Sequence, residues 1–333
     1  MSTLADRILA GDARAIARGI SLIEDEDPAG AELVRAIFGR TGGAYLIGVT
    51  GPPGAGKSTL VDRLVAIIRS ERSHRRHDGA SSPSRESAPS VGVIAVDPTS
   101  PFTGGAVLGD RLRMQAHAAD EGVFIRSMAT RGHLGGLARA TGDAALLLDA
   151  AGKEIVVIET VGVGQDEVDI IRTADVSIVT LVPGTGDEVQ ALKAGIMEIA
   201  DIFVVNKADR EGAERLVSAV EANLALHTYG PAEWRPPIVK TTATTGQGVR
   251  DVVDAIWRFR DHAERTQAAR RRARSEYRLR ELVAHQFMDH LEHRVLAPGE
   301  LTAVVDRIAE RSLDPYTAAR ELVARGCARE ISD

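Results

Sequence analysis

The chain has 333 residues and a formal net charge of −6 at pH 7, with 44% hydrophobic and 4% aromatic residues. The hydrophobic share is enough for a large buried core, whereas the negative charge and the few aromatic side chains weigh against nucleic-acid binding. A single cysteine, Cys327, excludes a disulfide framework within the chain. No apolar run has the length of a leader or a membrane span, so we expect a cytoplasmic protein that binds neither nucleic acid nor membrane.

The N-terminal region, residues 1–40, has a helical pattern. Apolar residues such as Ile8, Ile16, Ile20 and Ile23 recur there at roughly helical spacing. We therefore predict a helical N-terminal extension over residues 1–40.

The pattern changes at Tyr45 to short Val- and Ile-rich runs that alternate with helical stretches. Near-continuous apolar runs of this kind are typical of strands buried on both faces of a parallel sheet, with helices as crossovers. The seven runs are YLIGVT, VGVIAVD, VFIRSM, EIVVIET, VSIVTLVP, IFVVNKAD and PPIVKTTAT. We predict an α/β domain over residues 41–260 with a mostly parallel central sheet flanked by helices. Within it, the polar, Ser-rich residues 71–90 are predicted to be a flexible surface insertion.

The C-terminal region, residues 261–333, is predicted to form a charged helical arm. Nine arginines lie between residues 258 and 280, interleaved with acidic residues. They could form a nucleic-acid patch, but a solvated helical face with i,i+4 pairs such as Arg260–Glu264 is the favoured interpretation.

The first strand is followed by GPPGAGKST, in which Gly51 and the Gly56-Lys57-Ser58 triplet are separated by four residues. This spacing is typical of a P-loop, whose backbone N–H groups and following helix bind phosphate. Lys57 would reach the β- and γ-phosphates, and the Ser58 hydroxyl would bind Mg²⁺. The candidate phosphate-binding residues are Gly51, Pro52, Pro53, Gly54, Ala55, Gly56, Lys57, Ser58 and Thr59.

A second motif, VVNKAD, indicates which base is bound. The carboxylate of Asp209 could accept hydrogen bonds from the N1–H and 2-amino groups of guanine, a donor pair that adenine lacks. The TTATTGQG loop follows the next strand and could support the base through a backbone N–H. The candidate guanine contacts are Asn206, Lys207, Asp209, Thr242, Ala243 and Thr244. Three motifs in this order predict a P-loop GTPase that binds GTP and GDP.

The region that would sense the third phosphate is less standard. Many P-loop GTPases have Asp-x-x-Gly at the end of a strand, followed by a Gln that orients the attacking water. In VVIETVGVGQ, Glu159 takes the acidic position, Gly162 is the glycine, and Val163 stands where the Gln would be. The site therefore lacks one positioning group, which predicts slow intrinsic hydrolysis that a partner completes.

Two further acidic residues are Asp97, which ends the second apolar run, and Asp110, which lies between the second and third runs. Each also has an ordinary interpretation, as a turn residue and as a helix N-cap respectively. Carboxylates near a Mg²⁺–triphosphate act through the metal or its waters. We predict Ser58, Asp97, Asp110 and Glu159 as the Mg²⁺ site, and Lys57, Asp97, Asp110 and Glu159 as the catalytic residues.

Several stretches together resemble the MeaB/ArgK/MMAA family of G-protein chaperones. They are GVTGPPGAGKST, AVDPTSPFTGGAVLGDRLRM, IETVGVGQDEVDI, GTGDEVQALKAGIMEIADIFVVNKAD and TTATTGQG, and the resemblance covers about residues 1–290. It implies a GTPase that attends an adenosylcobalamin-dependent acyl-CoA mutase, most often methylmalonyl-CoA mutase. In that role the protein gates cofactor loading and helps to eject damaged cobalamin.

The resemblance also implies interfaces. Residues Gly184 to Lys193 match the switch loop through which the family communicates with the mutase, although Val189, Ala191 and Leu192 depart from the commonest family pattern. The C-terminal arm, residues 261–333, matches the arm through which family members form homodimers.

Two other functions stay open at this point. A GTPase metallochaperone for nickel enzymes is one, and His285, His290 and His293 invite it, but no cysteine lies near them. A transport-linked P-loop kinase is the other, although a kinase has no use for a guanine-specific loop.

Overall fold

The computed structural model describes residues 2–71, 88–97, 114–117, 119–129, 136–160, 162, 171–184 and 196–328. The chain divides into two compact units, Met1–Arg265 and Thr266–Asp333, and each is described by itself. Among the helices in the described ranges, none combines the length and apolar character needed to cross a membrane.

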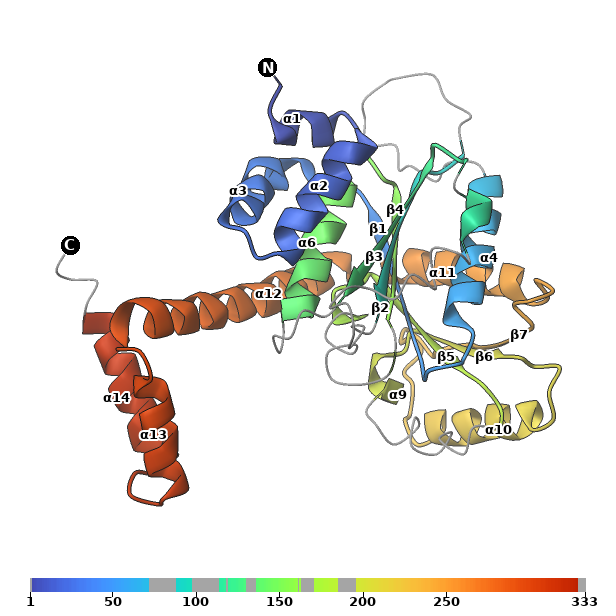
Figure 1. Cartoon of the computed structure of the whole chain (residues 1–333). Coiled ribbons are helices and arrows are strands. Elements are labelled where there is room, and N and C mark those ends of the chain that lie inside the picture. The colour runs from blue at the N-terminus through green and yellow to red at the C-terminus, as the bar shows by residue number, and fades with distance from the viewer. Residues whose placement is uncertain are drawn as a thin grey trace. The chain divides into compact units, whose positions relative to one another are not determined.

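The first unit is built on a seven-stranded sheet in the order β3-β2-β4-β1-β5-β6-β7 (Figure 1). Every neighbouring pair of strands is parallel. The strands are β1 (Tyr45–Thr50), β2 (Val91–Asp97), β3 (Val123–Ala129), β4 (Ile155–Glu159), β5 (Val176–Leu181), β6 (Ile202–Asn206) and β7 (Ile238–Thr241). Each of the seven predicted apolar runs is a strand, so the predicted α/β fold with a parallel sheet is confirmed.

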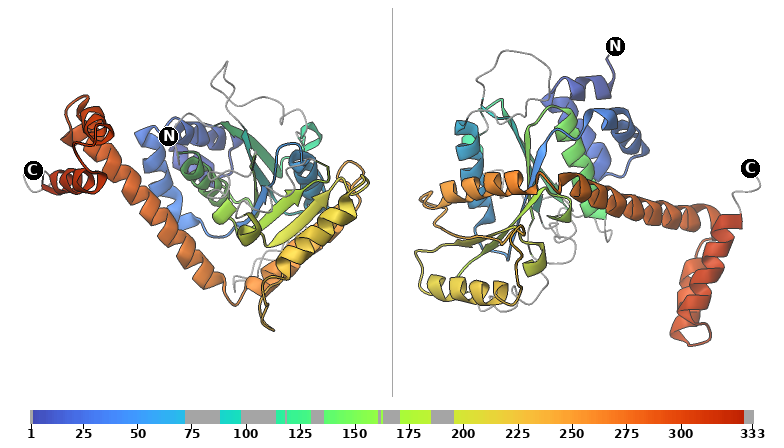
Figure 2. Two further views of the ribbon diagram at one scale, coloured as in Figure 1. Left: turned by 90° about the horizontal axis from the view of Figure 1, so that it is seen from below. Right: turned by 180° about the vertical axis from the view of Figure 1, so that it is seen from behind.

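Helices cover both faces of this sheet, because the strands are apolar on both faces. All residues of β4, β5 and β6 are buried. One face packs against α4 (Lys57–Ser70) and α11 (Val249–Ala263) in a single apolar cluster. Figures 1 and 2 show the N-terminal helices and α6 (Gly136–Ala150) on the other face. That face also carries α9 (Ile196–Ile199) and α10 (Ala213–Leu224), which pack against β5 and β6.

The predicted N-terminal helices are present as α1 (Leu4–Leu9), α2 (Ala13–Glu24) and α3 (Pro28–Ile37), followed by a 3₁₀ turn over Phe38–Arg40. Side-chain oxygens of Thr3, Asp12 and Asp27 cap the three helices by accepting backbone N–H bonds. The predicted apolar positions Ile8 and Ile16 are buried in one cluster with residues of α6. The extension is thus packed within the first unit and forms part of its core.

The arginine run is divided between the two units. Arg258 and Arg260 belong to α11, and the arginines from residue 270 onward belong to α12 (Gln267–His290). The predicted solvated helical face with i,i+4 pairs is confirmed in α12, where no residue is buried and Arg280 pairs with Glu276. Arg260 is the exception. Its half-buried guanidinium lies 5.0 Å from the ring centroid of Trp257 and 5.9 Å from that of Tyr45. Trp257 lies on the same helix and Tyr45 lies on β1, and both rings attract the cation.

The second unit contains α12, a π-helical turn over Leu291–Val295, α13 (Glu300–Ala309) and α14 (Pro315–Ala328). A small core of Leu291, Val295 and Leu296 joins these elements. Arg325 of α14 pairs with Glu300 of α13 and lowers the pKa of that carboxyl to about 2. No residue of α12 is buried.

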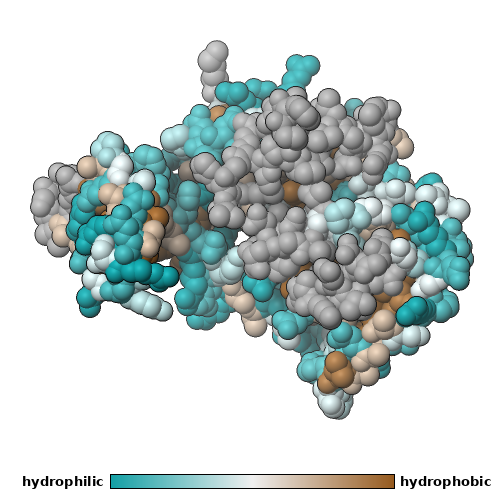
Figure 3. All heavy atoms as spheres, turned by 60° about the horizontal axis from the view of Figure 1, so that its bottom comes forward, coloured by the Kyte–Doolittle hydropathy of each residue, from teal (hydrophilic) through white to brown (hydrophobic). Residues whose placement is uncertain are grey.

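The coloured surface in Figure 3 is mostly hydrophilic, with small separate hydrophobic areas.

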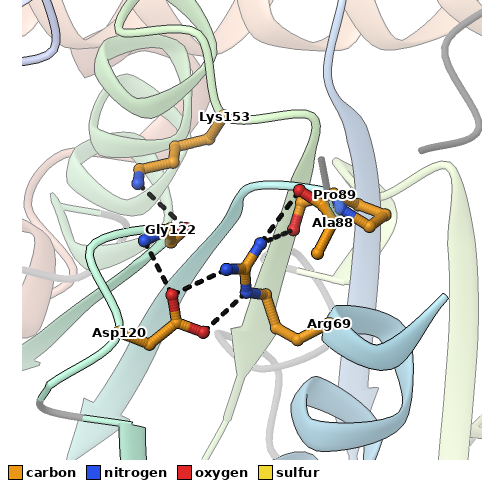
Figure 4. Close-up of polar contacts among 6 residues, drawn as sticks. All are labelled: Arg69, Ala88, Pro89, Asp120, Gly122 and Lys153. Atoms are coloured by element: carbon orange, nitrogen blue, oxygen red, sulfur yellow. Dashed lines mark hydrogen bonds and ion pairs between the residues drawn. The ribbon is translucent and has the colours of Figure 1, made fainter. Parts of the chain in front are cut away.

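A polar clamp holds the C-terminal end of α4 against the segments that enter β2 and β3 (Figure 4). The Arg69 guanidinium donates two hydrogen bonds to Asp120, of 2.6 and 2.7 Å, and two more to the carbonyls of Ala88 and Pro89. Gly122 lies against it, and a Cβ there would be only 2.4 Å from the guanidinium. The hydrogen bonds from Arg69 hold the pKa of Asp120 below its ordinary value, although burial acts in the opposite direction.

We expect this clamp to make folding stability depend on pH. Because the pKa of Asp120 is lowered in the folded state, the ion pair stabilises the fold at neutral pH, and this contribution is lost as the pH falls through that lowered pKa. Arg69→Met should reduce the free energy of unfolding by on the order of 2 kcal/mol at neutral pH. Urea denaturation at neutral pH and near pH 3 should show a smaller difference from wild type in acid. Arg35→Met, which breaks an exposed pair with Glu32, is the control and should change stability much less. An equal loss at both pH values would contradict this account.

Candidate nucleotide-binding site

The loop between β1 and α4 has the strand–loop–helix context that a P-loop requires. The strand ends at Thr50 and the helix begins at Lys57. Gly51 has a φ of 146°, and a Cβ on it would lie 2.0 Å from the carbonyl oxygen of Thr180 on β5. Gly56 has a φ of 85°, and a Cβ there would lie 2.5 Å from Nδ2 of Asn206. Neither position has room for a side chain, because residues of β5 and β6 lie against the backbone.

Lys57 places its charge inside the curve of this loop. The side chain is 6% exposed, and its Nζ donates to the carbonyls of Gly51 at 2.8 Å and Pro52 at 3.1 Å. Pro53 and Gly54 form the exposed tip of the loop. A phosphate oxygen that takes the place of those carbonyls would meet a buried ammonium group and the N-terminus of α4.

Glu159 lies beside the first turn of α4. It is the last residue of β4, is 4% exposed, and accepts a 2.6 Å hydrogen bond from the Ser58 hydroxyl. A hydroxyl and a carboxylate are oxygen ligands of the kind that Mg²⁺ prefers. The chemistry of this buried pair therefore fits a magnesium ion at the phosphate loop.

The other predicted acidic residues are only partly placed. Asp97 ends β2, and the register of β2 with β4 sets Ala95 opposite Glu159, so the Asp97 backbone lies at the same edge of the sheet. The Asp97 side chain lies outside the described residues, as do Asp110, Val163 and residues 185–193 of the switch loop. Within the described part of the chain, no three His, Cys, Asp or Glu side chains group as a metal site.

Asn206 joins the base loops to the phosphate loop. It ends β6 and is 2% exposed. Its Nδ2 donates to the carbonyl of Ala55 at 2.8 Å, and its Oδ1 accepts from the Thr241 hydroxyl at 3.0 Å and from the Ala243 N–H at 3.1 Å. Because both ends of the amide are engaged by protein atoms, Asn206 holds the end of β6, the P-loop and the loop after β7 together.

The remaining guanine candidates surround this amide. Lys207 has a left-handed φ of 55°, and its Nζ donates to the carbonyl of Gly54 at 2.7 Å. Asp209 is exposed and accepts from the Thr242 hydroxyl at 3.4 Å. The carbonyl of Thr244 accepts from Arg63 of α4 at 3.1 Å. The exposed carboxylate of Asp209 is thus carried on a loop that is itself fixed to the P-loop.

These groups meet at the carboxyl ends of the parallel strands, with β1 between β4 and β5 (Figure 1). Ligands of open α/β sheets bind at this edge. The structure brings together the P-loop, Glu159 and the loops after β6 and β7. Sequence reasoning missed Thr50, Thr160 and Thr241, whose hydroxyls tie these loops together. The signal that could have found them is a hydroxyl residue at the end of an apolar strand that adjoins a motif.

Comparison with known proteins agrees with this geometry. The family model described as methylmalonyl Co-A mutase-associated GTPase MeaB matches residues 16–295. A candidate GTPase of Pyrococcus abyssi is 47% identical over 97% of both chains. The GTPase ArgK of Escherichia coli is 32% identical over 96% of both chains. The crystal structure of a LAO/AO transport system kinase is similar with a TM-score of 0.68 and 26% identity, and the match covers 96% of this chain and 95% of that one. The chain therefore belongs to the MeaB family of methylmalonyl-CoA mutase-associated GTPases.

Proposed function

We propose that this GTPase is a Mg²⁺-dependent chaperone of an adenosylcobalamin-dependent acyl-CoA mutase of the methylmalonyl-CoA mutase type. In this role it gates cofactor loading and protects or reactivates the mutase. The observation that carries the proposal is the family match, because a single match over residues 16–295 spans every loop of the nucleotide site and the family is associated with that mutase.

The described side chains suit the binding and hydrolysis of GTP. Lys57 and the N-terminus of α4 would neutralise charge on the phosphates. Ser58 and Glu159 would hold Mg²⁺, which when bound neutralises charge that develops on the β- and γ-phosphate oxygens. Asp209 would select guanine by accepting its two donors. Phosphoryl transfer depends mainly on positioning and charge neutralisation, and these residues supply both.

Regulation by the mutase is the second part of the proposal. With Val163 where a water-orienting Gln would stand, the isolated protein would hydrolyse GTP slowly. The bound mutase would complete the site, and residues 184–193 are the segment proposed to contact it. Such coupling is reciprocal in its binding free energies, so GTP would tighten mutase binding by the same factor.

We also propose that the protein acts as a homodimer formed through its second unit. Leu279, Val283 and Met288 of α12 are 62%, 57% and 43% exposed. Apolar side chains along a helix with no buried residue are expected to pack against a partner, and the family resemblance suggests that this partner is a second copy.

Two alternatives differ in their support. A nickel metallochaperone has no positive support among the described residues, where Cys327 is exposed and no acidic or histidine cluster accompanies it. A transport-linked kinase is supported by the name of the similar solved structure. Transfer of the γ-phosphate of GTP to an acceptor other than water would favour the kinase.

The proposed function is tested by the GTP hydrolysis rate with and without the adenosylcobalamin-dependent mutase from the same genome. We expect stimulation of about tenfold or more, because the partner supplies positioning that the isolated site lacks. A mutase with unrelated substrate and no cobalamin dependence is the control. Bound GTP without any stimulation would remove the chaperone proposal and leave the nucleotide site intact.

Lys57→Ala should weaken GTP and GDP binding by roughly ten- to a hundredfold, the effect of one charge-assisted contact. The melting temperature should stay close to that of wild type, since backbone groups form the loop. Titration calorimetry measures the affinity, and Lys240→Ala, which removes a surface pair with Glu214, is the matched control. Unchanged affinity in Lys57→Ala would show that the phosphates bind elsewhere.

Asp209→Asn should weaken GTP binding by about tenfold or more, because an amide cannot accept both guanine donors. Xanthosine triphosphate carries a carbonyl in place of the 2-amino group, so the same variant should bind it more tightly than wild type does. Competition binding with both nucleotides measures this exchange, and Asp254→Asn on the exposed side of α11 is the control. If Asp209→Asn kept the wild-type preference for guanine, the base assignment would be wrong.

A further inference from the structure

Two buried threonines connect the P-loop strand to Gly162. Thr50 is the last residue of β1, and Thr160 directly follows Glu159 at the end of β4. Each is 1% exposed. Oγ1 of Thr50 donates to the carbonyl of Gly162 at 2.8 Å, and Oγ1 of Thr160 lies 2.9 Å from Oγ1 of Thr50.

The available protons determine the direction of these bonds. Each hydroxyl carries one proton, so the arrangement that satisfies all three groups runs from Thr160 to Thr50 and from Thr50 to the carbonyl of Gly162. Oγ1 of Thr160 is 3.4 Å from the same carbonyl, which makes its direct bond the weaker one. The backbone N–H of Thr160 donates to the carbonyl of Val49, which fixes the position of the first donor in this series of hydrogen bonds.

Thr50 and Thr160 do not point toward Ser58 and Glu159, the residues that would hold Mg²⁺. Side chains alternate between the faces of a strand, so Glu159 points to the α4 face of the sheet, where it meets Ser58. Thr160, the next residue, has the opposite direction, and Thr50 pairs in register with Val179, whose side chain packs on that same opposite face. The hydroxyls therefore act on the nucleotide site through Gly162.

We propose that Thr50 and Thr160 are positioning residues that hold Gly162 beside the third phosphate of GTP. In GTPases, the segment after this strand is ordered by contacts with the γ-phosphate and Mg²⁺. Because Thr50 already fixes the Gly162 carbonyl beside β1, GTP has to order less of the segment after β4 when it binds. GDP lacks the third phosphate, so it would contact only the P-loop and the base loops. The threonine pair thus sets the preference for GTP over GDP and the rate of hydrolysis. This inference rests on the family's GTPase activity and is independent of the mutase partner.

The test compares hydroxyl deletion with hydroxyl retention in the full-length protein. Thr50→Val keeps the side-chain shape and removes the donor, and Thr50→Ser keeps the donor. For Thr50→Val we expect about three- to tenfold weaker binding of a non-hydrolysable GTP analogue, the effect of one neutral hydrogen bond, with GDP affinity changed by less than about twofold. Single-turnover GTP hydrolysis should slow by a similar factor. Thr50→Ser should restore both values, and Thr160→Val should act in the same direction with a smaller effect.

Thr141→Val is the matched control. Thr141 lies on α6 and is fully buried, and its hydroxyl has no hydrogen-bond partner among the residues that the structure describes, so its removal should leave both affinities and the rate unchanged. Thermal denaturation checks that each variant is folded. If Thr50→Val does not fold, the nucleotide affinities and hydrolysis rate of Thr160→Val provide the test. An unchanged ratio of GDP to analogue affinity, or an equal loss for both nucleotides, would overturn the proposal while the nucleotide site stands. A wild-type protein that binds neither nucleotide would overturn the site and the proposal together.

Discussion

The nucleotide site depends on the hydrogen bonds of one buried amide. Asn206 donates to the carbonyl of Ala55 in the P-loop and accepts from Thr241 at the end of β7 and from Ala243 directly after it. An amide buried at the end of an apolar sheet without partners would be strongly unfavourable, so the two segments that satisfy it are held in one arrangement with β6. The spacing between the phosphate site and Asp209 follows from this arrangement. The P-loop and the predicted guanine loops after β6 and β7 are therefore already fixed to each other before a nucleotide binds.

The helix α4 gains its position from contacts at both ends. At its N-terminus, Ser58 bonds to Glu159 at the carboxyl edge of the sheet, and at its C-terminus Arg69 is clamped to Asp120 at the amino edge. Between these ends, its apolar face packs against β1, β4 and α11. A helix held in this way presents its N-terminal N–H groups in a constant direction, which is what phosphate binding requires. Thr50, the residue directly before the P-loop, also donates a hydrogen bond to the carbonyl of Gly162.

The parallel sheet explains why the candidate nucleotide-binding groups lie at one edge. Parallel strands place all their carboxyl ends together, and loops at that edge can change in sequence while the sheet stays constant. The nucleotide loops lie in the first unit, and α12 to α14 form the second. The segment proposed to contact the mutase, residues 184–193, also belongs to the first unit, whereas the proposed dimer contact belongs to the second.

The sequence by itself determined the seven strands and the parallel sheet, and it predicted the nucleotide loops, because apolar runs and glycine spacing are local properties. Only the tertiary structure decided how those loops are fixed to one another. Asn206 was predicted as a guanine contact, and the structure shows its amide engaged by two segments distant in sequence, the P-loop and the end of β7 with the loop after it. Thr50 and Thr160 are 110 residues apart and meet because β1 and β4 are neighbours. Arg260 left its expected solvated face for two rings, one of them more than two hundred residues away. Such contacts follow from strand order and helix packing, which no local pattern encodes.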